Sequence, residues 1–380
     1  MAVVKRHVRA ILNHELTPVA LKWGFLASIL IVAAAWIAFE AIHPAVVKDP
    51  AALPRATGSN AFSLAALHRR LPPSALETVQ RYVDLFATRQ RRRVQDGLSR
   101  SGRYLETYRS IFRAEGVPEE LVYLPMVESG YMETAVSPAQ AAGIWQFIEE
   151  TGKRYNLERT DWYDARMDPI VSGTAAAKLL KHLYGQFNDW DLALAAYNAG
   201  PGTVRWAIKS NTKANLPTGY WHLGLPEETR AYVPAFIAMV LIAKNPTAFG
   251  FGPIQFQARV VFDQVKVAPG VSLVDFSDHA GLDLAAVVSL NPELLRAEIP
   301  PGSKPYVLRV PRGTKAAILD RIAGVKFPAA SDYVISVVSE EDTMESLASQ
   351  YQVRVASIQQ ANRIESDEDL ALRRFVVIPL

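Results

Sequence analysis

Residues 121–152, LVYLPMVESGYMETAVSPAQAAGIWQFIEETG, decide the fold of the central part of this chain. The Pro-Glu-Glu at 118–120 favours a helix start, because proline suits the first helical position and acids suit the first turn. Apolar residues at 121, 124 and 127 then recur at near-helical spacing, which predicts a core-facing row of side chains. We expect this helix to stop beside Ser129-Gly130.

Glu128 is the last residue of this predicted apolar helix. A carboxyl group in such a place is partly removed from water, which raises its pKa and suits it to donating a proton at neutral pH. The alternative is an exposed glutamate that only makes the helix end soluble. On this segment alone the exposed glutamate is the favoured interpretation.

Two further stretches place polar groups where helices break. The AGIWQF of residues 142–147 indicates backbone beside a groove, with the amide of Gln146 to bind a substrate and aromatic rings to stack on sugar faces. A buried structural Trp145 is the alternative. The WDLALAAYNAGPG of residues 190–202 predicts a helix that ends at Tyr197-Asn198 before a Gly-Pro-Gly turn. This arrangement presents Tyr197 and Asn198 at a cleft, unless it only terminates the helix.

The composition excludes several classes of protein. The 380 residues are 49% hydrophobic and 21% charged, which is typical of globular protein with two or three domains. A net charge of +3 does not suggest a nucleic-acid partner. The lack of cysteine excludes disulfides, thiolate metal sites and a lipid anchor on cysteine. The histidines show no HExxH spacing and no phosphate-binding glycine loop is present, so we expect no metal and no cofactor.

The N-terminal region predicts a membrane anchor. Residues 23–39, WGFLASILIVAAAWIAF, carry no charge, and with their flanks the apolar span reaches residues 23–42. Basic residues precede this span and acids follow it, which places residues 1–22 in the cytoplasm and the remainder across the membrane, in the periplasm or cell envelope. A cleaved secretory signal and a buried core helix are the alternatives. An uncleaved anchor is favoured, because the apolar run is long for a signal and no convincing cleavage site follows.

The exported part divides into three regions. Residues 43–75 contain five prolines and predict a tether, whereas residues 76–250 show helical periodicity throughout and predict an all-α domain. Beyond the FGFGP at 249–253 the order strand, helix, helix, strand occurs twice, within 260–312 and 332–380. We therefore expect an all-α domain followed by two small βααβ modules, which are diverged copies of one unit.

At this point the chain resembles the goose-lysozyme-like lytic transglycosylases, of the membrane-bound murein transglycosylase D type, over roughly residues 76–245. Five short matches carry the resemblance: Glu128-Ser129-Gly130, Ser137 nine positions later, the G-x-W-Q at 143–146, the A-Y-N-A-G at 196–200 and the E-T-R-x-Y-V at 228–233. The resemblance implies a lysozyme-like domain with Glu128 as the catalytic acid, reached by Tyr232. Ile148-Glu149 stands where the family usually has Met-Pro, and the predicted anchor helix replaces the family's lipid-bearing cysteine.

The two C-terminal modules resemble LysM modules, which recognise glycan strands containing N-acetylglucosamine (GlcNAc). Module 332–380 has Asp342-Thr343 and Asn362 at family positions, although Glu341 replaces the usual glycine. Module 260–312 keeps Asn291-Pro292 but lacks the Asp-Thr turn, so we interpret it as degenerate. The implied partner is the glycan of peptidoglycan; the sequence identifies no protein partner.

The resemblance implies a mechanism with a single acid. Glu128 protonates the oxygen between N-acetylmuramic acid (MurNAc) and GlcNAc, the substrate's 2-acetamido group stabilises the cationic sugar, and Glu128 then acts as base on the C6 hydroxyl. The product is a 1,6-anhydro sugar. Five residues would orient the acetamido group and the acid: Ser137, Gln146, Tyr197, Asn198 and Tyr232. A hydrolytic muramidase and a non-catalytic peptidoglycan-binding protein are the alternatives.

Overall fold

The computed structural model describes residues 71, 73–327, 333–338, 342–371 and 375–379. The predicted anchor at 23–42 lies outside these residues, as does nearly all of the predicted tether at 43–75. Within the described part of the chain, no helix combines the length and apolar character needed to cross a bilayer. The first described helix, α3, begins at Pro73, inside the predicted tether, because proline is well suited to the first turn of a helix.

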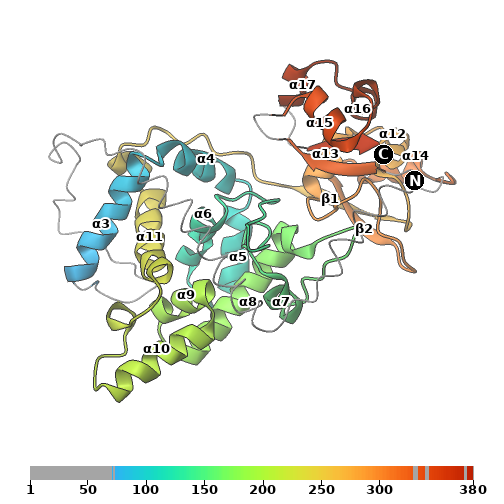
Figure 1. Cartoon of the computed structure of the whole chain (residues 1–380). Coiled ribbons are helices and arrows are strands. Elements are labelled where there is room, and N and C mark those ends of the chain that lie inside the picture. Colours follow the sequence, from blue (N-terminus) through green and yellow to red (C-terminus); the bar gives the residue numbers. More distant parts are fainter. Residues whose placement is uncertain (1–70, 72, 328–332, 339–341, 372–374, 380) are drawn as a thin grey trace. The chain divides into compact units, whose positions relative to one another are not determined.

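The predicted helical domain is confirmed (Figure 1). Between residues 73 and 249 the described chain forms helices joined by loops, with isolated β-bridges in place of strands. The α-helices are α3 (Pro73–Ala87), α4 (Arg91–Ser101), α5 (Leu105–Glu115), α6 (Pro125–Glu128), α7 (Glu149–Arg154), α8 (Pro169–Phe187), α9 (Trp190–Ala199), α10 (Pro201–Lys213) and α11 (Glu227–Lys244).

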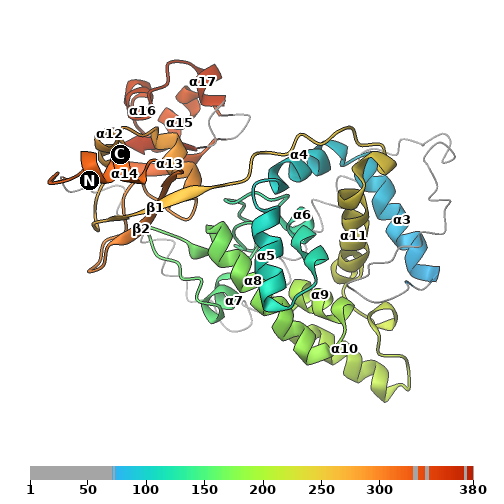
Figure 2. The same ribbon diagram turned by 180° about the vertical axis from the view of Figure 1, so that it is seen from behind.

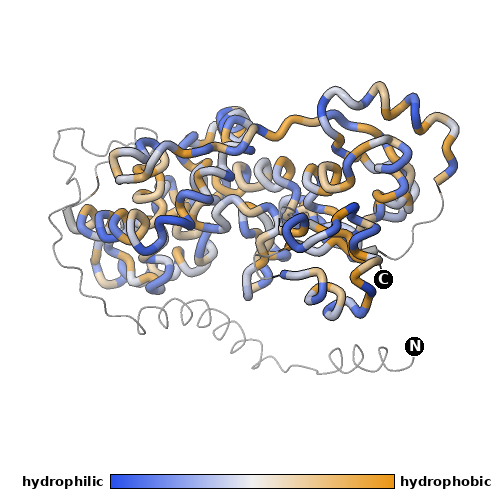
Figure 3. Tube along the Cα trace, turned by 90° about the horizontal axis from the view of Figure 1, so that it is seen from above, coloured by the Kyte–Doolittle hydropathy of each residue, from blue (hydrophilic) through white to orange (hydrophobic). Residues whose placement is uncertain are grey.

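Helix α9 is the centre of this domain, and α8, α10 and α11 pack against it. Its residues 191–196 are all buried, because small alanine side chains let neighbouring helices approach closely. Helix α5 packs along α8 on another side of the domain (Figures 1 and 2). Hydrophobic and hydrophilic residues interchange along the described part of the chain (Figure 3), whereas residues 191–196 of α9 are buried on every side.

Aspartates fix the starts of the two central helices. Asp168 accepts hydrogen bonds from the backbone N–H groups of Ile170 and Val171 at 2.8 and 3.0 Å, and thereby caps α8. Asp189 caps α9 in the same way, with an oxygen 2.7 Å from the nitrogen of Asp191. Each cap satisfies helix N–H groups that would otherwise lack a partner.

Two small modules follow the helical domain. The first module consists of β1 (Phe262–Val267), α12 (Leu273–Ala280), α13 (Leu284–Leu290) and β2 (Tyr306–Pro311). The second module consists of β3 (Tyr333–Val337), α15 (Met344–Tyr351), α16 (Val355–Asn362) and β4 (Phe375–Pro379). In each module the two strands pair antiparallel. Two short helices were not predicted, α14 (Lys315–Arg321) after the first module and α17 (Asp367–Ala371) within the second.

Each module has an asparagine that makes the same pair of hydrogen bonds. Asn291, just after α13, accepts from the backbone nitrogen of Arg309 at 2.9 Å and donates to its carbonyl at 2.8 Å. Asn362, at the end of α16, makes the same pair of bonds to Val377, at 2.7 and 2.6 Å. In each case the side chain ties the second helix to the second strand. This shared contact supports the prediction that the modules are diverged copies.

Candidate active site

Glu128 ends α6 next to the buried leucines that were predicted to face the core. Leu121 and Leu124 are fully buried, and Glu128 itself is half-buried. Removal from water raises the pKa of the Glu128 carboxyl from 4.5 to about 7, and the negative charge of Glu228 contributes to the rise. A hydrogen bond from Tyr232 partly opposes it. The carboxyl is therefore poised to exchange a proton near neutral pH.

Tyr232 comes from α11 and donates its hydroxyl hydrogen to Oε1 of Glu128. The ring of Tyr232 is buried in the core of the helical domain, which fixes where the hydroxyl points. Burial and the neighbouring charge of Glu128 raise the pKa of Tyr232 well above its usual value. Tyr232 therefore keeps its proton and acts as a donor.

The loop of residues 142–147 is held by side chains from three other parts of the chain. Three of its backbone carbonyls accept hydrogen bonds, Ile144 from Ser129 Oγ at 2.8 Å, Trp145 from the Tyr197 hydroxyl at 2.7 Å and Phe147 from Arg166 Nη1 at 3.1 Å. Ser129 directly follows the catalytic candidate Glu128. The loop is thus tied both to the end of α6 and to α9.

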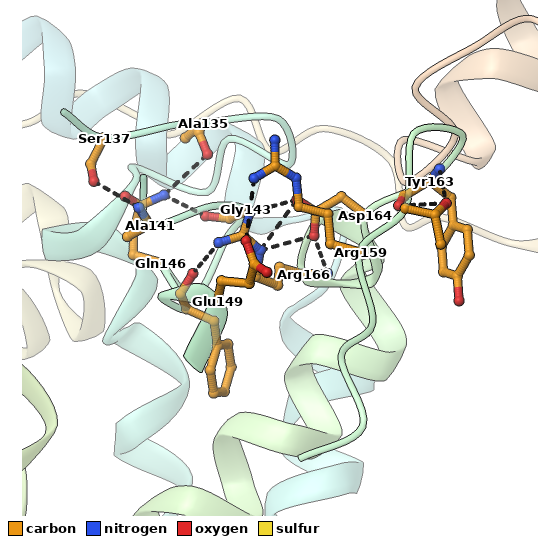
Figure 4. Close-up of polar contacts among 12 residues, drawn as sticks. Ala135, Ser137, Ala141, Gly143, Gln146, Glu149, Arg159, Tyr163, Asp164 and Arg166 are labelled. Carbon is orange, nitrogen blue, oxygen red and sulfur yellow. Dashed lines mark hydrogen bonds and ion pairs between the residues drawn. The ribbon is translucent and has the colours of Figure 1, made fainter. Parts of the chain in front are cut away.

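Gly143 and Gln146 have left-handed backbone conformations in this loop, with φ of +80° and +49°. A Cβ atom at Gly143 would lie 2.0 Å from the carbonyl oxygen of Arg166, so only glycine fits. The side-chain nitrogen of Gln146 donates to the carbonyls of Gly143 and Ala135, at 2.9 and 3.2 Å (Figure 4). Because these bonds engage its N–H groups, Gln146 would meet a substrate through its carbonyl oxygen.

The idea that the rings of this loop stack on sugars is wrong. Trp145 is fully buried, and its ring centre lies 5.5 Å from that of Phe112 and 5.1 Å from that of Tyr108. Phe147 is buried as well. The small residues before Trp145 serve close packing inside the domain, so the structural alternative holds for both rings.

Asn198, at the end of α9, is bound to the start of α11. Its oxygen accepts from the hydroxyl of Thr229 at 2.9 Å, and its nitrogen donates to Glu228 Oε1 at 3.3 Å. The sequence analysis assigned no role to Thr229 or Glu228, although both lie in the motif that contains Tyr232. A signal was available, because residues four positions apart on a helix, such as 228 and 232, share a face.

Ser137 begins a turn formed by residues 137–141. Its backbone nitrogen donates to the carbonyl of Ala141 at 2.9 Å, and its hydroxyl oxygen accepts from the nitrogen of Ala141 at 3.0 Å (Figure 4). These contacts stabilise the turn. The role of Ser137 at the site stays a prediction.

Three other glutamates near Glu128 in sequence take part in other interactions. Glu133 is buried, and its Oε1 accepts from the hydroxyl of Tyr104 at 2.9 Å and from Arg103 Nε at 3.1 Å. Glu149 and Glu150 form surface ion pairs with basic residues of α7. In the described part of the chain, no group of three or more His, Asp or Glu side chains is arranged to hold a metal ion.

The same segments match known families. Residues 111–216 match the transglycosylase SLT domain, residues 261–323 match the LysM-like domain of lytic transglycosylase MltD, and residues 337–379 match the LysM domain. The chain thus contains an SLT-type transglycosylase domain followed by two LysM-type domains.

Among individual proteins, the chain is 33% identical over 268 residues to the membrane-bound lytic murein transglycosylase D of Escherichia coli K12. That alignment covers 67% of this chain and 59% of the relative, so the chain spans about three fifths of the relative's length. It is also 32% identical over 139 residues to peptidoglycan transglycosylase gp16 of phage T7, covering 36% of this chain and 10% of that protein. Among solved structures, the lytic transglycosylase Slt of Pseudomonas aeruginosa, an inactive mutant, aligns with a TM-score of 0.29 at 24% identity, covering 41% of this chain and 25% of that one.

Proposed function

We propose that this protein is a lytic transglycosylase that cleaves the β-1,4 bond between MurNAc and GlcNAc in peptidoglycan and forms 1,6-anhydroMurNAc. One observation carries the proposal. Within a domain of the SLT type, the half-buried carboxyl of Glu128 has a pKa of about 7 and is hydrogen-bonded by Tyr232. Such a carboxyl can give up a proton and take one back within a single reaction.

In the first step Glu128, protonated, donates its proton to the glycosidic oxygen, and the bond from that oxygen to C1 of MurNAc breaks. The 2-acetamido oxygen of the same sugar stabilises the positive charge at C1. Glu128 is then a carboxylate, which the hydroxyl of Tyr232 stabilises by its hydrogen bond. In the second step this carboxylate removes the proton from the C6 hydroxyl, O6 bonds to C1, and Glu128 is protonated again.

The surroundings of Glu128 favour this route over hydrolysis by a pair of carboxylates. Glu133 is bound by Tyr104 and Arg103, and Glu149 and Glu150 are paired on the surface. Glu228 is the carboxylate whose charge acts on Glu128, and its Oε1 is bound by Asn198. In this proposal the negative charge of Glu228 raises the pKa of Glu128 and so helps to keep Glu128 protonated.

The remaining site residues have supporting parts in this proposal. Gln146 would accept a hydrogen bond from the substrate's N-acetyl N–H through its side-chain oxygen, and Ser137 would help orient the same group. Asn198 would hold Glu228 near the acid. Tyr197 would act by fixing the loop of residues 142–147 through the carbonyl of Trp145.

The proposed setting is the cell envelope. The apolar span at 23–42 would anchor the chain in the membrane, with the domains after it in the periplasm, and the LysM-type modules would hold glycan strands. The name of the E. coli relative describes that protein as membrane-bound, which supports this setting.

Digestion of peptidoglycan sacculi with the purified chain, followed by mass spectrometry of the products, tests the function. We expect 1,6-anhydro ends, each lighter by one water than a hydrolysed end. Glu128→Gln should lower the rate by at least about 100-fold, as expected for loss of a general acid. Reducing ends instead of anhydro ends would identify a hydrolytic muramidase. Binding of sacculi without cleavage by the wild type would identify a non-catalytic binding protein.

A further inference from the structure

A buried ion cluster joins the first module to the helical domain. Arg309 on β2 is only 8% exposed, and its guanidinium contacts the carboxylate of Asp168, the residue that caps α8. The Nη1 atom of Arg309 lies 3.0 and 3.1 Å from the two carboxylate oxygens of Glu293. Tyr306 donates its hydroxyl to Glu293 at 2.8 Å. Asp168 and Glu293 are 6% and 3% exposed, so two buried carboxylates share one arginine.

Backbone pairing extends this contact along the chain. The nitrogen of Asp164 donates to the carbonyl of Glu293 at 2.8 Å, and the nitrogen of Leu295 donates to the carbonyl of Trp162 at 2.7 Å. Trp162 also donates its ring N–H to Glu298 at 3.3 Å. The segment 161–164 of the helical domain and the segment 293–298 of the first module therefore form one continuous interface.

The same segment of the helical domain supports the loop of residues 142–147. The guanidinium of Arg166 binds Asp164, with Nε 2.9 Å from Oδ1 and Nη2 2.6 Å from Oδ2. Its third nitrogen donates to the carbonyl of Phe147 at 3.1 Å, and its own carbonyl lies against Gly143 (Figure 4). Hydrogen bonds thus lead from Glu293 through Asp164 and Arg166 to the loop that carries Gln146.

The charges make this docking specific. An ionised carboxylate is strongly disfavoured in a buried place without a partner, and the burial of Glu293 beside Asp168 raises the pKa of Glu293. Arg309 satisfies both carboxylates through its two branches. Because Arg309 and Glu293 belong to the module and Asp168 to the helical domain, Asp168 gains this partner only when the two are docked.

We propose that Arg309 and Glu293 are positioning residues for the active site, and that the first LysM-like module is a fixed support of the loop at 142–147. The part of this inference that is tested by enzymatic activity rests on the proposed function. It also explains the degenerate sequence of the first module, since a supporting module keeps its fold and its docking residues without needing a glycan-binding turn.

The test compares Arg309→Met and Arg309→Lys with Arg312→Met. Arg312 is an exposed arginine after β2 and serves as the matched control. The first readout is amide hydrogen exchange of residues 142–147, measured by mass spectrometry on the whole chain. The second is the separate measurement of KM and kcat on soluble glycan oligomers.

We expect faster exchange in the loop of Arg309→Met, and a KM raised about tenfold or more with a smaller change in kcat, because Gln146 shifts while Glu128 and Tyr232 stay in place. The alkaline limb of the pH profile, which reports Glu128, should not move. Arg309→Lys should recover part of the effect, because lysine can reach only one carboxylate at a time. Arg312→Met should match the wild type.

A second variant keeps the inference testable if Arg309→Met does not fold. Trp162→Ala loosens the same interface without leaving a buried charge unpaired, and should change loop exchange and KM in the same direction by a smaller factor. Wild-type exchange and wild-type KM in the folded variants would overturn the inference. A wild-type chain that forms no anhydro products would instead overturn the proposed function, while the exchange measurement would still decide on the support of the loop.

Discussion

Replacing Tyr232 with phenylalanine isolates the hydrogen bond at the carboxyl of Glu128, the proposed catalytic acid. The buried ring is kept and the hydroxyl that donates to Glu128 is lost. A hydrogen bond to a charged group contributes about 1.5 to 3 kcal/mol, and one pKa unit corresponds to about 1.4 kcal/mol. Because the bond favours the carboxylate form, its loss should raise the pKa of Glu128 by about one to two units above its value of about 7.

The direction of the activity change follows from the proposed role of Glu128 as an acid. Activity requires the protonated form and falls as pH rises through the pKa, so the alkaline limb of kcat/KM should move to higher pH in Tyr232→Phe. Below that limb the rate should drop by about 10- to 100-fold, because the carboxylate formed during proton donation loses the same stabilisation.

The assay is the release of anhydro products from glycan oligomers across the neutral and alkaline range. Tyr351→Phe is the matched control, because it removes a hydroxyl that binds Ser336 in the second module, at 3.2 Å. Its profile should equal that of the wild type. An alkaline limb that stays in place or moves to lower pH in Tyr232→Phe would refute the reasoning.

Three further predictions concern stability and the second carboxylate. Because the pKa of Glu128 is raised in the folded state, its contribution to stability falls as pH rises from 4.5 through about 7. Glu128→Gln should therefore stabilise the protein by up to about 3 kcal/mol above pH 7 and by little below pH 4.5, as measured by denaturant unfolding at both pH values. Gly143→Ala should destabilise by about 3 kcal/mol or more and abolish activity, because its Cβ would overlap the Arg166 carbonyl. Gly185→Ala is the control: it lies in α8 with open space around it, so it should keep activity and stabilise the protein by up to about 1 kcal/mol, since alanine favours a helix over glycine. Glu133→Gln should lower the melting temperature but keep the pH profile of activity, since Glu133 is held in an ion pair; loss of activity without loss of stability would instead indicate a second catalytic carboxylate.

Local patterns predicted the elements of this fold well. The Pro-Glu-Glu start and the apolar spacing predicted one helix from about residue 118 to Glu128. Its end is confirmed, since α6 ends at Glu128, but the segment is a 3-10 helix at Glu119–Tyr123 followed by the four-residue α6. The alternation after residue 253 predicted two βααβ modules, which the strand pairing confirms. These features depend on neighbours in sequence, so they can be read from sequence.

Contacts between distant segments could not be predicted in this way. Nothing near Trp145 in sequence shows that its ring points into the core, because the direction depends on packing against α5. The pairing of Arg309 with Asp168 joins residues 141 positions apart. The approach of Tyr232 to Glu128 was expected from the family resemblance and not from any periodicity of this chain.

The central claim is that burial keeps the carboxyl of Glu128 protonated until it meets the glycosidic oxygen. A carbon-13 NMR titration of glutamate side chains, with Glu128 assigned by the signal lost in Glu128→Gln, tests this claim directly. The account predicts a carboxyl that titrates near pH 7. A carboxyl that titrates near the ordinary value of 4.5 would contradict it, because Glu128 would then be ionised and unable to act as the acid at neutral pH.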